Sequence, residues 1–248
     1  MAFDALFQPI SIGSLKLPNR IIMSAMSTRF PKTGGGMTEK VLEHYSRRAR
    51  GGASLITVEL ADVHPLMPHL RQTLWLHHDS AIPEMRRLTD AIHENGSRAS
   101  IQIGVFFRPA QAGLRQYTSS LESPEVLPNA QELSAGDLSR LGDIIAAACL
   151  RARKAGYDAV ELHGMHGSIV EEFLSPYWNR RKDAYGGSRE KRMRFPLELL
   201  EKTRKAVGED FPVIFRICGS EFHPEGSTID DAAAFARAAE ERGLNAVS

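Results

Sequence analysis

The sequence predicts an α/β protein and, within that class, a (β/α)8 TIM barrel. Three observations support this: short apolar runs alternate with longer amphipathic ones, glycine follows several amphipathic runs, and polar residues recur at the ends of the apolar runs. Alternating strands and helices are typical of right-handed βαβ units around a buried parallel sheet. A length of 248 residues, with 42% hydrophobic and 25% charged residues, suits one large domain with a sizeable core.

Six short segments are predicted as strands because they are apolar on both faces and rich in β-branched residues. They are residues 21–23, 54–59, 99–103, 159–163, 212–217 and 246–247. Because a complete barrel has eight strands, about six of the eight positions are present in this chain. We therefore expect residues 1–248 to form one barrel domain, truncated before strands 7 and 8, which usually carry the phosphate-binding loops.

Five amphipathic segments between these strands are predicted as helices, at residues 38–50, 82–95, 134–155, 194–207 and 229–242. Glycines after four of them suit left-handed helix caps: Gly51-Gly52, Gly96, Gly156 and Gly243. Oxygen-bearing residues at two helix starts can accept hydrogen bonds from free backbone N–H groups: Ser134 with Asp137, and Ser227-Thr228 before Asp230-Asp231.

The polar strand ends favour a closed barrel over a doubly wound sheet. No strand is followed by Gly-x-Gly-x-x-Gly, the signature of dinucleotide-binding folds. The strand-end residues are Ser24, Glu59, Gln102, His163 and Arg216. In a barrel these ends converge on one mouth, where active sites form. Residues 108–133 and 65–73 lack helical periodicity and are predicted as loops over the same mouth.

Charge and composition exclude several classes of partner. A net charge of +1 provides no field to attract nucleic acid or an anionic membrane surface. No run approaches the roughly 18 apolar residues of a membrane span, and the start lacks the pattern of a secretory signal. Only Cys149 and Cys218 are present, which excludes a disulfide framework, and Cys149 is predicted as a core residue. We expect a cytoplasmic protein with a small-molecule substrate, either monomeric or a homo-oligomer.

His163 and His166 are the leading candidates for chemistry. Two imidazoles three residues apart on a turn can point at one ligand. They could serve as local structural hydrogen-bonding groups, as donors to an anionic or carbonyl oxygen, or as a metal pair. A metal would need a further ligand; strand alternation is expected to point Glu161 away from His163, which leaves Glu59. The metal pair is the least favoured of these three roles, and we predict no metal site.

Gln102 and Arg216 extend this candidate site. Polar side chains at the ends of apolar strands are costly unless they have partners. The amide of Gln102 offers a donor and an acceptor, which match an imide edge, and Arg216 offers a fixed positive charge for an anionic heteroaromatic ring. Each could also be an internal ion-pair or mouth residue. Together with the histidines they outline a pocket for a polar-edged ring.

Several motifs resemble the old yellow enzyme family over nearly the whole chain. They are Phe-Gln-Pro-Ile at 7–10, Pro-Asn-Arg-Ile-Ile-Met-Ser-Ala-Met at 18–26, the run 51–59, His-Gly-Met-His-Gly at 163–167, Glu-Phe-Leu-Ser-Pro at 172–176, Asn-Arg-Arg-Lys-Asp at 179–183 and Tyr-Gly-Gly-Ser at 185–188. The layout is most similar to the barrel domain of 2,4-dienoyl-CoA reductase and trimethylamine dehydrogenase relatives.

The resemblance implies an oxidoreductase with FMN at the barrel mouth and NAD(P)H as electron donor. Ser24, Ala25 and Met26 would lie along the flavin, with Ser27 and Leu60 beside the ring. Gln102 would pair with its pyrimidine edge, and Arg216 would offset charge near N1. His163 and His166 would hold the substrate oxygen. An iron–sulfur cluster and a second flavin are expected only if a region follows Ser248.

Two departures from the family pattern leave the reaction open. Ser168 stands where many relatives have a proton-donating tyrosine, and Val105-Phe106-Phe107-Arg108 makes part of the mouth apolar. The first hypothesis is reduction of an activated C=C bond of an enone or an enoyl or dienoyl thioester, with Ser168 as a candidate catalytic residue. The alternative is oxidative N-demethylation of a methylated amine. A metal-dependent barrel hydrolase using His163, His166 and Glu59 is the alternative from another class.

Overall fold

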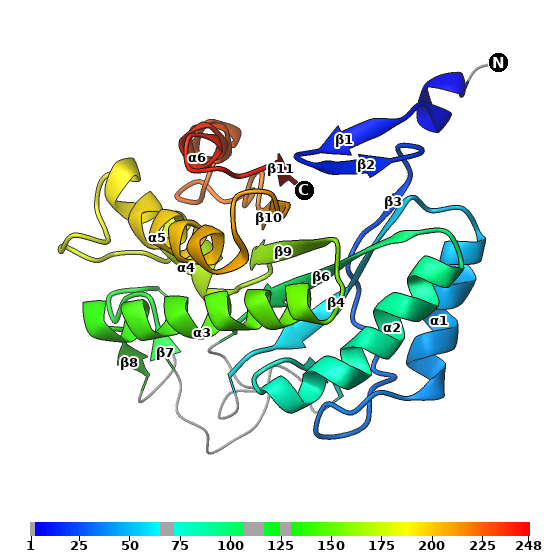
Figure 1. Cartoon of the computed structure of the whole chain (residues 1–248). Helices are drawn as coiled ribbons and strands as arrows, with labels where there is room; N and C mark the ends of the chain where they lie inside the picture. Colours follow the sequence, from blue (N-terminus) through cyan, green and yellow to red (C-terminus); the bar gives the residue numbers. More distant parts are fainter. Residues whose placement is uncertain (1–2, 65–71, 107–116, 125–129) are drawn as a thin grey trace.

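The central element is a curled parallel sheet whose strands follow one another in chain order. The computed structural model describes residues 3–64, 72–106, 117–124 and 130–248. Neighbouring strands run β3-β4-β6-β9-β10-β11, with bounds Ile22–Met23, Leu55–Asp62, Arg98–Gly104, Ala159–Gly164, Val213–Ile217 and Ala246–Val247, and β5 (Leu74–Trp75) pairs with the end of β4. A doubly wound sheet would reverse its order at a switch point. The barrel class is therefore confirmed, with six barrel strand positions in the described chain (Figure 1).

Helices follow the barrel strands, as predicted. They are α1 (Glu39–Arg50), α2 (Ile82–Glu94), α3 (Ala135–Lys154), α4 (Ile169–Leu174), α5 (Arg189–Val207) and α6 (Ile229–Glu240). Among the α-helices of the described residues, α4 alone is unpredicted. Helix α5 starts at Arg189 rather than at residue 194, because Ser188 caps it by accepting from Lys191 N. Its first turn is charged, so apolar periodicity does not mark it. No described helix is long and apolar enough to cross a membrane.

The predicted helix punctuation is confirmed. Gly52, Gly96, Gly156 and Gly243 all have φ between 83° and 91°, the left-handed region that favours glycine. Ser134 with Asp137, and Thr228 with Asp231, form reciprocal capping boxes. Local side-chain chemistry therefore accounts for these helix ends.

The barrel strands β4, β9 and β10 divide their side chains between two apolar clusters. Outward residues such as Val58, Ile101 and Phe215 pack with the helices in the main core. The alternate residues Leu55 and Ile214 belong to a second cluster on the lumen face. This division follows from the two-residue period of a β-strand.

An unpredicted N-terminal hairpin packs on the amino-terminal end of the lumen. Its strands β1 (Ile10–Ile12) and β2 (Leu15–Leu17) are antiparallel, and they follow a short 3-10 helix η1 (Asp4–Phe7). Ile12, Leu15 and Leu17 share the second cluster with the lumen residues of the barrel strands. The hairpin, which lies beside one end of the sheet in Figure 1, thus covers lumen side chains that the strands alone would leave in water.

Two charged side chains hold the described part of the predicted 108–133 excursion. Strands β7 (Tyr117–Thr118) and β8 (Gln131–Glu132) pair with each other in this segment. A short 3-10 helix, η2 (Asp79–Ala81), is not part of it and precedes α2. Buried Arg181 donates from Nη1 to the carbonyl oxygens of Ser119 and Leu133, each at 2.9 Å. Buried Glu172 accepts from Ser119 N at 2.9 Å. Residues 107–116 and 125–129, and 65–71 of the second predicted loop, lie outside the described residues.

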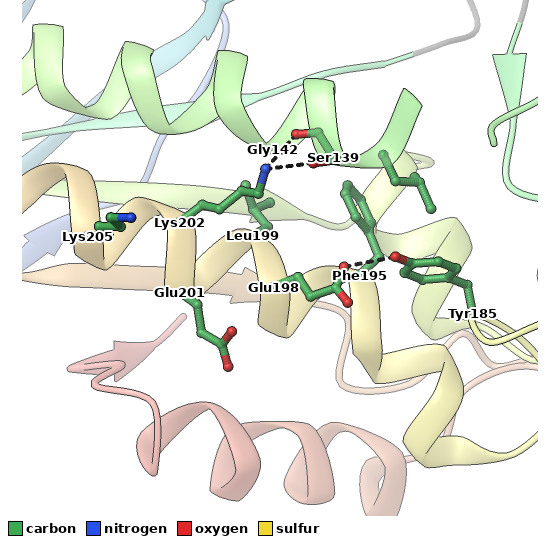
Figure 2. A pocket seen from close by; sticks show the side chains of 10 residues that line it. Ser139, Gly142, Tyr185, Phe195, Glu198, Leu199, Glu201, Lys202 and Lys205 are labelled. Carbon is green, nitrogen blue, oxygen red and sulfur yellow. Dashed lines mark hydrogen bonds between the residues drawn. The ribbon is translucent and has the colours of Figure 1, made fainter. Parts of the chain in front are cut away.

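The outer surface carries a hollow of about 430 Å³ between α3 and α5. Figure 2 shows the Lys202 ammonium donating to the carbonyl oxygen (2.8 Å) and hydroxyl (3.0 Å) of Ser139. Tyr185 donates its hydroxyl to Glu198 Oε2 at 3.1 Å. Lys202 connects α5 to α3, and Tyr185 connects α5 to the loop that precedes it. The hollow therefore belongs to helix packing, away from the strand ends.

Leu17→Ala should lower the free energy of unfolding by about 2–5 kcal/mol, because Leu17 is 1% exposed in the hairpin cluster. Lys16→Ala, at an exposed neighbouring position, is the matched control and should change it by less than about 0.5 kcal/mol. Urea unfolding of both variants measures the difference. Equal stabilities would show that the hairpin does not pack on the lumen as described.

Cys149 should resist thiol reagents in the native protein. It is fully buried, as predicted, and burial raises the pKa of its thiol to about 12. Cys218 is half-buried, and its pKa is also raised, first by burial and then by the charge of Glu171. At pH 8 a thiol reagent should label Cys218 slowly and Cys149 only after denaturant is added. Equal labelling rates for both thiols under native conditions would contradict this packing.

Candidate active site

The predicted polar strand ends lie beside one another at the carboxyl end of the sheet. Glu59 lies in the second half of β4, and Gln102, His163 and Arg216 lie within the last three residues of β6, β9 and β10; the four strands are consecutive neighbours in the sheet. Arg216 is the direct parallel partner of His163. The first three are 0–6% exposed, and Arg216 is half-buried. The structure therefore brings together the group that sequence patterning singled out.

The loop after β3 supplies an accessible backbone segment at the same end. Ser24, Met26 and Ser27 are exposed, and Ala25 is half-buried. Thr28 attaches this loop to β4: its N–H and its hydroxyl each donate to the Glu59 carboxylate at 2.8 Å. Sequence reasoning missed Thr28, since nothing local distinguishes a threonine that reaches a neighbouring strand.

Glu59, which holds the loop after β3 through Thr28, is fully buried. Burial raises the pKa of its carboxyl, and the two hydrogen bonds from Thr28 oppose that shift by favouring the charged form. Its backbone N–H donates to the hydroxyl of Tyr45, a fully buried residue of α1, at 2.9 Å. The first helix, the second barrel strand and the exposed loop are thereby joined at one residue.

Leu60 lies in an irregular part of β4, and its side chain and that of His163 are both close to Gly104. The register of β4 against β6 shifts between Val58 and Ala61. A Cβ added to Gly104 would lie 2.7 Å from His163 Cβ and 3.2 Å from Leu60 Cδ1. Glycine at 104 therefore leaves the room in which Leu60 and His163 approach each other.

The turn that carries the two histidines is held from beneath by α4. Ser168 caps this helix by accepting from Glu171 N at 3.3 Å and donates its hydroxyl to the His163 carbonyl oxygen at 3.2 Å. Gly167 N donates to the carboxylate of Glu171. Ser168 is fully buried, and its hydroxyl is engaged in the helix cap and in the bond to the His163 carbonyl oxygen.

The imidazoles of His163 and His166 face the same region, with ring centroids 5.5 Å apart. The ring centroids of Phe106 and His163 are 5.3 Å apart, so the apolar sequence that includes Phe106 lies beside the histidines. His166 is exposed and has φ of 60°. Partial burial, and then the charge of Arg216, lower its pKa below 6.5, so the ring is neutral at pH 7. Arg216 Nε donates to Met165 Sδ at 2.9 Å.

Backbone strain is concentrated in the loops that follow the strands. Among the described residues, the non-glycine positions with positive φ are Arg29, His166 and Phe222, in the loops after β3, β9 and β10. Such conformations cost free energy and cluster at functional sites. Their distribution supports placing the site at this end of the barrel.

The expectation that Glu161 points away from His163 is wrong. Residues two apart on a strand share a face, so Glu161 lies on the same lumen face as His163. It is 3% exposed, and its Oε1 accepts from Gln102 Nε2 at 2.7 Å. The two-residue period, applied correctly, predicts this placement.

The metal interpretation of the histidine pair gains no support from the geometry. Glu59, the candidate third ligand, is bonded to Thr28. Within the part of the chain that the structure describes, no group of three or more His, Cys, Asp or Glu side chains is arranged to hold a metal ion.

The fold is of the TIM-barrel class, and the structure places an amide, a guanidinium and two imidazoles near the carboxyl ends of its strands, where active sites of such barrels form. The chain belongs to the NADH:flavin oxidoreductase / NADH oxidase family, whose description matches residues 5–248.

Individual relatives agree with this assignment. The chain is 34% identical over 250 residues to an NADH oxidase of Thermoanaerobacter brockii, covering 98% of this chain and 38% of the relative. It is 36% identical over 240 residues to an N,N-dimethylglycine/sarcosine dehydrogenase of Chromohalobacter salexigens, covering 93% and 34%. Old Yellow Enzyme from Pichia sp. AKU4542 superposes with a TM-score of 0.86 at 25% identity, covering 98% of this chain and 70% of that one. The chain spans little more than a third of the two curated relatives.

Glu59→Gln should remove a pH dependence of stability. Because the folded pKa of Glu59 is raised above 4.5, the folded state binds the proton more tightly, and this contribution to stability is lost as pH rises through the folded pKa. Relative to wild type, Glu59→Gln should therefore gain stability from pH 4 towards neutrality. Urea unfolding at a series of pH values measures this difference.

Thr28→Val is the companion variant for the same titration. It removes a hydroxyl that stabilises the charged carboxylate, so its stability deficit relative to wild type should grow with pH. If both differences stay constant between pH 4 and 8, the Glu59 environment described above is wrong.

Proposed function

We propose that this chain forms the ring-binding and substrate-binding part of an FMN-dependent oxidoreductase of old yellow enzyme type. The reaction exchanges a hydride between flavin N5 and a small organic substrate. The observation that carries the proposal is the convergence of Gln102, Arg216, His163 and His166 at the carboxyl ends of consecutive strands.

The donor set fits an isoalloxazine ring. Gln102 lies near the carboxyl end of β6, where its amide can match the imide of the pyrimidine edge. Arg216 places a permanent positive charge on β10, two strands from Gln102 and beside His163, suited to the negative charge that a reduced ring carries near N1. The accessible segment Ser24–Ser27 and buried Leu60 would flank the ring. When bound, FMN supplies the centre that accepts or donates hydride.

The histidine pair would hold the substrate oxygen. A neutral imidazole has one N–H to donate, and His166 is neutral at pH 7. Two such donors on one oxygen polarise a carbonyl and stabilise charge that develops on it during hydride transfer. Phe106 beside His163 would exclude water from this contact. We propose an enone or an enoyl or dienoyl thioester as substrate, with NAD(P)H as the source of electrons.

The position of Ser168 bears on the second proton of alkene reduction. Its hydroxyl is buried and bonded to the His163 carbonyl oxygen and Glu171 N–H, so we assign it to positioning the histidine turn. Any proton delivered to the substrate carbon would then come from another group or from water. Oxidative N-demethylation needs no such donor and is the second candidate, favoured by the 36% identity to a dimethylglycine/sarcosine dehydrogenase.

Flavin binding tests the proposal directly. The purified protein is titrated with FMN and with lumiflavin, which keeps the ring but lacks the ribityl phosphate, and quenching of flavin fluorescence gives each Kd. Binding of lumiflavin is expected, because Gln102, Arg216 and Leu60 are proposed to contact the ring, which lumiflavin keeps. Absence of binding by both probes would overturn the proposal.

Anaerobic spectra of the flavin-loaded protein distinguish the two reactions. Bleaching of the flavin by a methylated amine, with no nicotinamide present, indicates demethylation. Reoxidation of NADPH- or NADH-reduced flavin by an enone or a dienoyl thioester indicates alkene reduction.

Replacing His163 and His166 together by alanine should leave lumiflavin affinity within about twofold of wild type. The same variant should bind a phenol such as 4-hydroxybenzaldehyde at least about tenfold more weakly, because two hydrogen bonds to its oxygen are lost. Perturbation of the flavin spectrum by the phenol gives its Kd, and thermal melting checks folding. Loss of flavin with unchanged phenol affinity would contradict the assigned roles.

A further inference from the structure

A carboxylate lies directly beside the amide that is proposed to pair with the flavin. Glu161 is the direct parallel partner of Gln102 in the register of β6 against β9, and both side chains lie on the lumen face. They are 3% and 6% exposed. Gln102 Nε2 donates to Glu161 Oε1 at 2.7 Å. The resemblance assigns Gln102 a role and leaves Glu161 without one.

The chemistry of the partner decides which way the amide faces. A glutamine amide has one end that donates and one that accepts, whereas a carboxylate only accepts. Both oxygens of Glu161 accept in this structure, since Ser248 Oγ donates to Oε2 at 2.8 Å. Only the NH2 end of Gln102 can therefore face Glu161. A reversed amide would place two acceptor oxygens against each other in a buried site.

The fixed amide presents a defined pattern to a ligand. With Nε2 bonded to Glu161, Oε1 of Gln102 faces away from that carboxylate and accepts no hydrogen bond from the residues that the structure describes. The second hydrogen of Nε2 is also available. Gln102 thus offers an acceptor beside a donor, which complements a ring edge carrying an N–H next to a carbonyl oxygen.

We propose that Glu161 is a positioning residue that locks the amide of Gln102 and thereby selects ligands with an imide N–H. This inference rests on the proposed function, because the ligand it selects is the pyrimidine edge of flavin. Glu161 itself touches no ligand in this proposal. It acts by removing the alternative orientation of Gln102, in which the NH2 end would meet the ligand N–H.

The test compares lumiflavin with N3-methyllumiflavin, whose ring edge cannot donate. Wild type should bind lumiflavin about tenfold more tightly than the methylated ring, the ratio expected for one buried hydrogen bond. In Glu161→Gln the new amide satisfies either orientation of Gln102, so the ratio should fall to about twofold. Because glutamine has the same shape as glutamate, a packing change does not explain such a fall. Quenching of flavin fluorescence gives each Kd.

Two further variants separate positioning from a general structural effect. Glu161→Asp keeps an acceptor-only partner and should retain most of the discrimination. In a Gln102→Ala background, Glu161→Gln should change the ratio by less than about twofold, because the residue through which it acts is gone. If Glu161→Gln does not fold, Glu161→Met, of similar length and without polar atoms, replaces it, and the same loss of discrimination is expected.

The outcomes are distinct from those of the proposed function. Failure of wild type to bind lumiflavin overturns the proposed function, and this inference with it. Binding by wild type with the same ratio in Glu161→Gln, or an equal effect in the Gln102→Ala background, leaves the proposed function standing and overturns the role of Glu161.

Discussion

The two-residue period of the strands is the constraint on which the rest of this structure depends. The central strands β4, β6 and β9 are buried along nearly their whole length, so each of their sequences must supply two different surfaces at once. Outward residues are apolar throughout and pack against the helices. Lumen residues change character along the strand: Leu55 and Ile214 near the amino ends lie under the hairpin, while Glu59, Gln102 and Arg216 follow towards the mouth. The polar site exists because its buried groups find partners on neighbouring strands.

Buried acidic side chains organise the mouth without facing a ligand. Glu59 holds the loop after β3 through Thr28, and Glu161 orients Gln102. Glu171 accepts from the histidine turn. A buried carboxylate is costly unless hydrogen bonds satisfy it, and here each one bonds to a segment that must be held in place. The same hydrogen bonds that compensate for burial thereby preorganise the site.

The most specific stretch of the family resemblance, residues 163–188, is largely architectural. His163 and His166 face the mouth, but Ser168 caps a helix, and Glu172 and Arg181 hold the excursion between β6 and α3. Motif density thus marks the segment that connects the histidine turn to the loops around it. A sequence signature of this kind identifies the family more readily than it separates catalytic residues from supporting ones.

The sequence by itself determined the barrel class, the barrel strands, five of the helices and the group of polar strand ends. These features rest on local periodicity, capping and glycine placement, which operate within a few residues of the chain. The tertiary structure decided the hairpin, the pairing of Thr28 with Glu59, the burial of Ser168 and the bond from Gln102 to Glu161. Most of those contacts join residues that are distant in sequence. Ser168 is different, because a serine can serve equally well as a proton donor or as a helix cap. Only the packing of strands against one another selects among them.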